Sequence, residues 1–264
     1  MEKIFFFNQI KNSFRYFDLI THIALKEVKI KYIRTLLGPI WNSLSIMIFI
    51  ISFGFVGSRL WGLDVEIFLP NFAASYIIWI CISNIIGEST TLLNANANIL
   101  KSVNTPILVF HLSMVLKNTS IFFHHVLAFF VISLFFSHDF SFSIIFIIFS
   151  VLFFFLISVL FSFSWSILCT RFSDLVPLTN NLLQLLFFIT PIFWPAERLT
   201  GTYFKLLVDF NPIYQILNLI KQPLMGNLIS MSNVISCIML IIFLLLIAIL
   251  VGNIFRKKII FFIN

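Results

Sequence analysis

The stretch Ile144-Ile-Phe-Ile-Ile-Phe-Ser-Val-Leu-Phe-Phe-Phe-Leu-Ile-Ser-Val-Leu160 is apolar on every face of a helix. The runs Ile46 to Val56 and Met239 to Val251 have the same character. Such runs need lipid or other helices around them, and they do not alternate apolar and polar residues as the strands of a membrane barrel do. They therefore predict helices that cross a membrane.

The composition agrees with a membrane protein. Charged residues make up 10% of the 264 residues, hydrophobic residues make up 60%, and the mean hydropathy is +1.07. A soluble domain of this length would need a charged surface, so water is not the main solvent of the chain. The net charge of +7 lies almost entirely outside the apolar runs, where topology signals sit, and nucleic-acid binding is therefore not expected. Cys81, Cys169 and Cys237 fall inside apolar runs without the paired spacing of a zinc site or a disulfide, and we expect packing roles for them.

The apolar runs divide the chain, taken as a single transmembrane domain over residues 1–264, into six spans of an all-α membrane protein. The first of them, about 20 nearly charge-free residues, is long enough to cross a hydrocarbon core of ~30 Å. The six spans are expected at about 37–58, 71–93, 106–136, 141–170, 177–194 and 229–253. Residues 8–34 are amphipathic and predict a helix in the membrane interface. The amide-rich residues 94–104 predict a loop or a short surface helix. Residues 196–228 are semi-polar and broken by glycine and proline, which predicts short re-entrant or interfacial helices.

The distribution of lysine and arginine predicts how the chain is oriented. With the N-terminus inside, twelve of the 17 basic residues fall on the cytoplasmic side, four fall outside, and Lys117 lies within the third span. Cytoplasmic loops carry an excess of basic residues, so both termini are expected in the cytoplasm. Residues 196–228 then lie on the outer side of the membrane.

The sequence lacks the short motifs of common catalytic sites. It has no glycine-rich phosphate loop ending in Lys-Ser/Thr, and no His-Glu-x-x-His, Cys-x-x-Cys or Gly-x-Ser-x-Gly. We therefore expect no catalytic residue, no metal site and no cofactor in this chain. Transport, channel and scaffold functions are left open.

Two stretches of the sequence are distinctive. The first, Lys31-Tyr-Ile-Arg34-Thr-Leu-Leu-Gly38-Pro39-Ile-Trp41, is a basic interfacial helix that runs into Leu-Gly-Pro-x-Trp. The second combines Arg171-Phe-Ser-Asp174-Leu, Phe188-Ile-Thr190-Pro191-Ile-Phe-Trp194 and Phe210-Asn211-Pro212. Together and in this order they resemble the type-2 ABC permeases that export O-antigen, capsule or teichoic-acid polysaccharides. The usual Arg-Asp pair of that family before the fifth span is here spread as Arg171-x-x-Asp174.

The resemblance implies the type-2 ABC exporter fold and a half-transporter. Two copies of the chain would form the pore, and two separate nucleotide-binding subunits would hydrolyse ATP with Mg²⁺ in the cytoplasm, which agrees with the missing phosphate loop. The cargo would be an undecaprenyl-diphosphate-linked glycan or a related lipid-linked polymer. It would move outward across the bacterial cytoplasmic membrane, through a channel lined by aromatic rings and past an outer re-entrant helical hairpin at 196–228.

Three candidate sites follow from the resemblance and from the positions of the residues. Aromatic residues near span ends or breaks are candidates for the channel, although an interfacial aromatic belt also explains them; they are Trp41, Tyr76, Trp79, Phe188, Phe193 and Trp194. Basic residues where the interface helix meets the first span would bind the lipid diphosphate or only set the topology; they are Lys29, Lys31 and Arg34. The 94–104 segment is the candidate cytoplasmic element that couples to the ATPase, through Asn96, Asn98, Lys101 and Asn104.

Ionisable residues within the spans allow other interpretations. Glu88, Lys117 and three histidines, His111, His124 and His125, would suit a proton relay, but a structural Glu88–Lys117 pair with hydrogen-bonded histidines is the simpler hypothesis. Serines at multiples of four on the fourth span predict close helix packing; they are Ser150, Ser158, Ser162 and Ser166. The rival functions are a type-2 exporter of drugs or small lipids, a proton-coupled carrier, and a membrane-embedded glycan enzyme. The enzyme is the weakest of these because no carboxylate pair sits at an expected membrane face.

Overall fold

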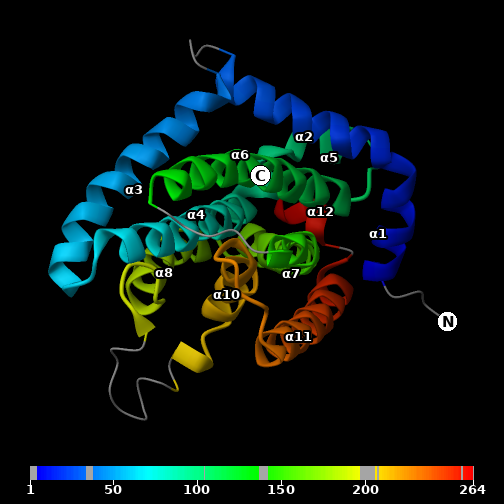
Figure 1. Ribbon diagram of the computed structural model, residues 1–264. Helices are drawn as coiled ribbons and strands as arrows, with labels where there is room; N and C mark the ends of the chain where they lie inside the picture. The colour runs from blue at the N-terminus through cyan, green and yellow to red at the C-terminus, as the bar shows by residue number, and fades with distance from the viewer. Residues whose placement is uncertain are drawn as a thin grey trace.

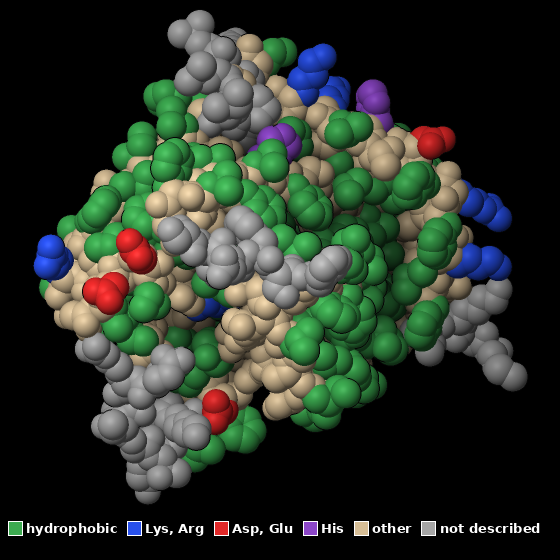
Figure 2. Space-filling model, viewed as in Figure 1, with side chains coloured by type: hydrophobic (Ala, Val, Ile, Leu, Met, Phe, Trp, Pro, Cys, Tyr) green, Lys and Arg blue, Asp and Glu red, His purple; other side chains and the backbone are tan. Residues whose placement is uncertain are grey.

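The computed structural model describes residues 5–33, 38–103, 105–136, 142–196, 206, 208–256 and 258–263, and these residues form helices without any strand. Five helical segments are long and apolar enough to cross a membrane. They comprise α3 (Pro39–Trp61), α4 (Val65–Ala95), α6 (Leu108–Phe135), α7 (Phe146–Arg171) with the short 3₁₀ turn η2 (Phe142–Ile145) before it, and α11 (Met231–Phe255). Hydrophobic side chains cover much of the face in Figure 2, while the charged side chains lie toward its edges. The expectation of an all-helical, multi-pass membrane protein is confirmed.

The centre of the bundle is α4. In the most apolar stretch of α4, 67% of the residues are buried. In the corresponding stretch of α11, which lies at the periphery, 22% are buried. In Figure 1, α4 and α6 run through the middle of the molecule, and α3 and α2 lie along one side of them. The core therefore forms around the second span, and α3, α6 and α11 each pack against α4 or α7.

The first span meets α4 through two glycines. A Cβ on Gly54 would stand 2.8 Å from Leu69 Cγ, and one on Gly57 would stand 2.7 Å from the ring of Phe68. Gly62 ends α3 with a left-handed backbone, φ 58°, a conformation that glycine adopts without strain. Because α3 and α4 approach each other closely at these glycines, α4 can begin as early as Val65. The second span is therefore longer than the expected 71–93.

The N-terminal segment differs from the single interface helix expected over 8–34. It consists of α1 (Phe5–Ser13), a 3₁₀ turn η1 (Phe14–Tyr16) and α2 (Phe17–Tyr32). The bend lets α1 reach α11, where the Phe5 N–H donates to Asn253 Oδ1 at 3.0 Å, and it leaves α2 packed along α6. The spacing of apolar residues along the stretch predicts a helix but does not reveal this turn.

Serine side chains on α7 mark close helix contacts, as expected. All four serines of the stripe are buried. The Ser150 hydroxyl donates to the Leu219 carbonyl of α10 (Pro212–Leu224) at 2.6 Å, and Ser166 Oγ lies 2.7 Å from His111 Nε2 of α6. The stripe thus joins α7 to a neighbour at each end, which confirms the packing interpretation.

The expected fifth span, 177–194, corresponds to α8 (Leu175–Ile189). At 1.5 Å per residue its 15 residues cover only ~22 Å, which is less than a ~30 Å hydrocarbon core. Irregular residues 190–196 follow it. Of the expected outer segment 196–228, the structure describes α10 and its flanks, so the re-entrant hairpin and the count of six spans stay predictions. Two further helices are short, α5 (Ala97–Ser102) and α12 (Ile259–Phe262).

Candidate functional site

A group of aromatic rings joins α3, α4, α8 and the segment that follows α8. Phe49 stacks on Tyr76 with ring centroids 4.6 Å apart. Phe187 lies 5.7 Å from Trp79 and 5.3 Å from Phe193. Phe68 borders the group through its stacking contact with Phe72. We call the following eight rings the aromatic cluster: Phe49, Phe53, Phe72, Tyr76, Trp79, Phe187, Phe188 and Phe193.

Four of the six sequence-predicted channel residues belong to the aromatic cluster: Tyr76, Trp79, Phe188 and Phe193. Trp194 borders it, because its indole N–H donates to the Phe188 carbonyl at 3.0 Å. Trp41 stands apart at the start of α3, half-exposed, and none of the described ring contacts connects it to the cluster.

Sequence reasoning missed the other four members of the cluster, Phe49, Phe53, Phe72 and Phe187. A signal was present, because Phe49 and Phe53 are four residues apart on α3 and Phe72 and Tyr76 are four apart on α4. Residues at this spacing share one face of a helix. Pairing these spacings between the first two spans would have identified Phe49, Phe53 and Phe72, but not Phe187 on α8.

A cavity of about 320 Å³ adjoins the aromatic cluster at the end of the molecule where α3 turns into α4. Phe72 and Phe193 belong to both. Polar groups enter its wall from three side chains, Asn71, Tyr214 and Lys221. We call it the outer cavity, because the orientation expected from the sequence would place it on the outer side. It offers aromatic faces, an amide, a phenol and a cation around one volume.

Helix α10 is linked to the end of α8 through Asn211. Asn211 Nδ2 donates to Thr190 Oγ1 at 2.9 Å, while Asn211 Oδ1 accepts from the backbone N–H groups of Ile213 at 3.0 Å and Tyr214 at 3.4 Å. The side chain thus caps α10, where Pro212 occupies the first helical position. The two motifs Thr190-Pro191 and Asn211-Pro212, 21 residues apart, are one structural unit.

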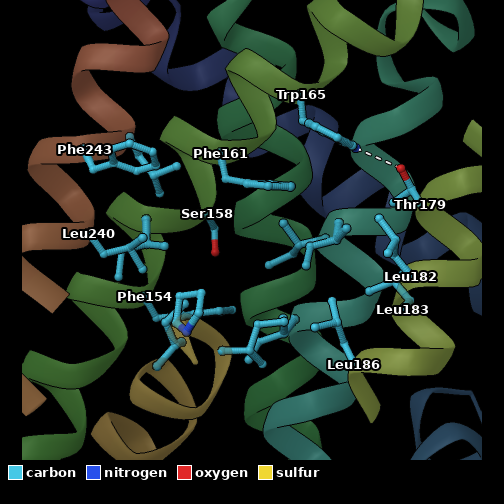
Figure 3. Close-up of a pocket in the computed structure, with 18 residues that line it drawn as sticks. Phe154, Ser158, Phe161, Trp165, Thr179, Leu182, Leu183, Leu186, Leu240 and Phe243 are labelled. Carbon is cyan, nitrogen blue, oxygen red and sulfur yellow. Dashed lines mark hydrogen bonds between the residues drawn. The ribbon is translucent and has the colours of Figure 1, made fainter. Parts of the chain in front are cut away.

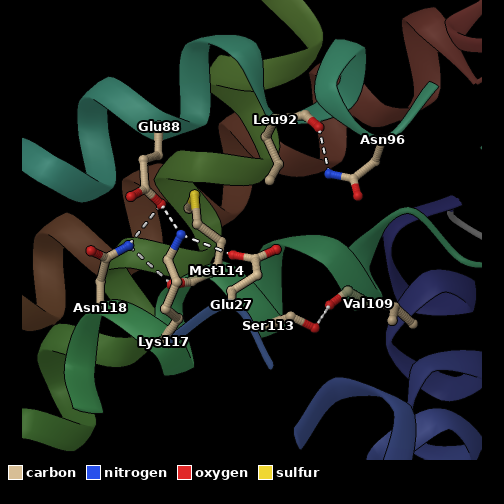
Figure 4. Close-up of polar contacts among 9 residues, drawn as sticks. All are labelled: Glu27, Glu88, Leu92, Asn96, Val109, Ser113, Met114, Lys117 and Asn118. Carbon is tan, nitrogen blue, oxygen red and sulfur yellow. Dashed lines mark hydrogen bonds and ion pairs between the residues drawn. The ribbon is translucent and has the colours of Figure 1, made fainter. Parts of the chain in front are cut away.

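A charged bridge connects three helices (Figure 4). Lys117 Nζ on α6 lies 2.7 Å from Glu88 Oε2 on α4 and 2.9 Å from Glu27 Oε2 on α2. Asn118 Nδ2 also donates to Glu88 Oε2, at 3.0 Å. The expected Glu88–Lys117 pair is confirmed, and Glu27, which the sequence did not suggest, completes it. We call Glu27, Glu88 and Lys117 the ionic bridge.

The histidines of the spans serve contacts between and within helices. His111 is 2.9 Å from the Ile107 carbonyl through Nδ1, in addition to its contact with Ser166. His125 Nε2 is 2.9 Å from Asn42 Nδ2 of α3, and His124 Nδ1 is 2.9 Å from the Ser120 carbonyl of its own helix. The described hydrogen bonds do not join these rings to the ionic bridge, and this arrangement agrees with the structural interpretation of the histidines.

The candidate coupling and diphosphate residues lie at helix ends. Asn98 and Lys101 are exposed on α5, whose Ala97 and Leu100 face inward, while the Asn96 amide donates to the Leu92 carbonyl at 2.9 Å. Lys29 and Lys31 occupy the exposed last turn of α2. Two further candidates, Arg34 and Asn104, lie outside the described residues.

Arg171, the basic member of the widely spaced Arg171-x-x-Asp174 pair, contacts aromatic rings. Its guanidinium lies 4.9 Å from the ring of Phe262 on α12 and 5.5 Å from that of Phe172. The described ion pairs do not include Arg171 with Asp174. A cation over an aromatic face is a favourable contact, and it ties the C-terminal helix to the end of α7.

Comparison with known families identifies the class of protein. The family of ABC-2 type transporters matches residues 19–225, from α2 to the end of α10. A comparison with curated proteins found no match. Since the matched region includes more than half of the 264 residues, the chain belongs to the ABC-2 type transporter family and is a transmembrane permease component of an ABC exporter.

Proposed function

We propose that this permease exports a lipid-linked polysaccharide of the undecaprenyl-diphosphate type, such as O-antigen, capsule or teichoic acid. It works as a homodimer in the bacterial cytoplasmic membrane, with both termini in the cytoplasm, and two separate ATPase subunits supply the energy. The observation that carries the proposal is the aromatic cluster together with the outer cavity beside it. Ring faces stack on the apolar faces of pyranoses, and the polar groups of the outer cavity suit their hydroxyl groups.

The exposure of the cluster separates contact residues from supporting ones. The Phe188 side chain is 63% exposed, Phe193 and Tyr76 are partly exposed, and Trp79 is only 6% exposed. Phe188 and Phe193 would therefore touch a passing glycan, while Trp79 holds the rings in place. In the dimer, the same residues of the second copy would line the other side of the path.

The cytoplasmic side would receive both the carrier and the ATPase. Lys29, Lys31 and Arg34 would bind the diphosphate at the depth of the lipid phosphates. The 94–104 segment, including α5, would dock on the ATPase, with α2 beside it. Because the ionic bridge ties α2 to α4 and α6, a displacement of α2 would reach the spans directly.

Deletion of the gene tests the cargo. The expected result is loss of a surface glycan, with its lipid-linked precursor retained inside the cell, and the same result when the phosphate-loop lysine of the partner ATPase is changed to alanine. Intact surface glycan with altered drug sensitivity would instead support the exporter of drugs or small lipids. Transport that stops with an uncoupler but survives ATP depletion would support the proton-coupled carrier.

Substitution within the aromatic cluster tests the path. Phe188→Leu keeps the apolar volume and removes the ring face, so glycan export should fall while the protein level is unchanged. The matched control is Phe149→Leu on α7, an outward-facing phenylalanine 40% exposed and outside the cluster. Equal export by the two variants would contradict a role for the cluster in contacting glycan.

A further inference from the structure

A second cavity, of about 340 Å³, lies among α4, α7, α8, α10 and α11 (Figure 3). Its lining is apolar except for Ser158 and Thr179, and no charged residue takes part. The Thr179 hydroxyl is already used, because it donates to the Leu175 carbonyl at 2.6 Å and accepts from Trp165 Nε1 at 3.1 Å. We call this cavity the apolar chamber.

The apolar chamber opens sideways between α8 and α11. Leu182 on α8 and Phe243 on α11 both line it, and both are exposed at the surface, by 41% and 59%. The main contacts of α8 are with α4 and α7, and those of α11 are with α7, α10 and α1, so among the described residues no extensive packing of α8 on α11 closes the space between them. The opening lies beside α11, which is long and apolar enough to span a membrane, so we expect it to face bilayer hydrocarbon.

Water is a poor occupant for such a space. A buried water needs two to four polar partners, and the chamber offers little beyond the Ser158 hydroxyl. An engineered apolar cavity of ~150 Å³ stays dry and takes up benzene, and the chamber is more than twice that size. An empty chamber would also leave its lining without dispersion partners.

We propose that the apolar chamber holds an acyl chain of a bilayer phospholipid, which enters between α8 and α11. Among hydrocarbon ligands the phospholipid is favoured by mass action, because it is the solvent on the open side and any exported lipid is a minor component. An acyl chain in the apolar chamber would lie between α8 and α11, so that flexible hydrocarbon and not interlocked side chains would fill the space between these helices. The proposal requires a membrane-embedded permease and is independent of the cargo.

Tryptophan quenching by brominated lipid tests the proposal. The chain has five tryptophans, so one variant keeps only Trp165, which lines the chamber, and a matched variant keeps only Trp79, which is 6% exposed within the aromatic cluster. Both are reconstituted in phosphatidylcholine brominated at successive acyl positions. We expect Trp165 to be quenched well above the level of Trp79, and equal quenching would overturn the proposal.

A filling variant separates the chamber from the surrounding lipid. Ser158→Phe in the chain that keeps only Trp165 places a ring inside the chamber, and quenching should fall to the level of Trp79. Leu152→Phe, on the exposed face of the same helix, adds a ring outside and should leave quenching unchanged. Should Ser158→Phe fail to fold, Leu240→Phe fills the chamber from α11.

Two outcomes with the Trp165 chain count against the proposal. Quenching that persists after filling would mean that the lipid touches Trp165 from elsewhere. Relief of quenching by a small mole fraction of unbrominated polyprenyl lipid would assign the chamber to an isoprenoid tail and overturn the phospholipid assignment. Neither outcome bears on which polymer is exported, so the cargo is tested separately.

Discussion

Removal of the cation from the ionic bridge is the sharpest test of how the helices are held together. In the variant Lys117→Met, Glu27 and Glu88 lose the ammonium group that lies between them. Methionine keeps most of the length and apolar stem of lysine, so the change is chiefly one of charge. The Lys117 side chain is 14% exposed, and the substitution therefore leaves little new room for water.

The size of the effect follows from the geometry. The two carboxylate oxygens are 2.9 Å and 2.7 Å from one nitrogen, so they stand no more than about 6 Å apart. Two unit charges at that distance repel by about 3 kcal/mol at an effective dielectric constant of ~20. The glutamates are 40% and 39% exposed, and solvent screening reduces the penalty to about 2 kcal/mol. For a chain of this size that corresponds to a fall of roughly 4–8 °C in the unfolding midpoint.

The assay is thermal unfolding of purified protein in one detergent at one scan rate, since membrane proteins often unfold irreversibly. The control is the triple variant with Lys117→Met, Glu27→Gln and Glu88→Gln, which removes all three charges and should regain most of the lost stability. A single variant that unfolds at the parental midpoint would refute the reasoning. So would a triple variant no more stable than the single one.

Three further substitutions have expected outcomes. Asn211→Ala removes the cap of α10 and should lower stability by about 1–2 kcal/mol, measured by the same unfolding assay. Gly57→Ala places a methyl 2.7 Å from the Phe68 ring and should cost about 1–3 kcal/mol, part of which Phe68→Leu recovers in the double variant. His111→Leu removes the imidazole beside Ser166 but leaves its hydroxyl the Phe163 carbonyl at 3.1 Å, so stability should fall by about 0.5–1.5 kcal/mol. Export should continue and stay insensitive to an uncoupler, and loss of export with full stability would favour a proton relay.

Apolar length predicts some of the spanning helices closely and others less well. The expected spans 106–136 and 229–253 agree with α6 and α11 within two residues at each end, because each is one continuous apolar run between polar breaks. The second span begins earlier than expected, because Pro70 resembles a boundary in the sequence. It lies instead inside α4, in the part that packs against α3 through Gly54 and Gly57.

The sites are less accessible to sequence reasoning because they are tertiary. Glu88 and Lys117 can be paired, since both are charges in apolar runs whose burial demands a partner. Glu27 lies among the many charges of an amphipathic helix, and its sequence position gives no reason to choose it. The apolar chamber is beyond prediction for the opposite reason, because nearly all of its lining residues are ordinary apolar residues and only the packing of five helices makes the cavity.

The arrangement around α4 suggests how motion would pass through the permease. At 1.5 Å per residue, its 31 residues extend over roughly 46 Å, so one rigid helix reaches from the ionic bridge past the aromatic cluster to the turn with α3. By contrast, α8 is short. A side-chain hydrogen bond at Thr179 connects it to α7, and one at Thr190, just after its end, connects it to α10. Rigid, buried helices move as units, while weakly held helices shift against them. We therefore expect α4 to transmit displacements of α2 to the rest of the bundle. We expect α8 to be the helix that moves relative to its neighbours. The lipid-filled chamber beside α8 would then supply the room that this movement requires.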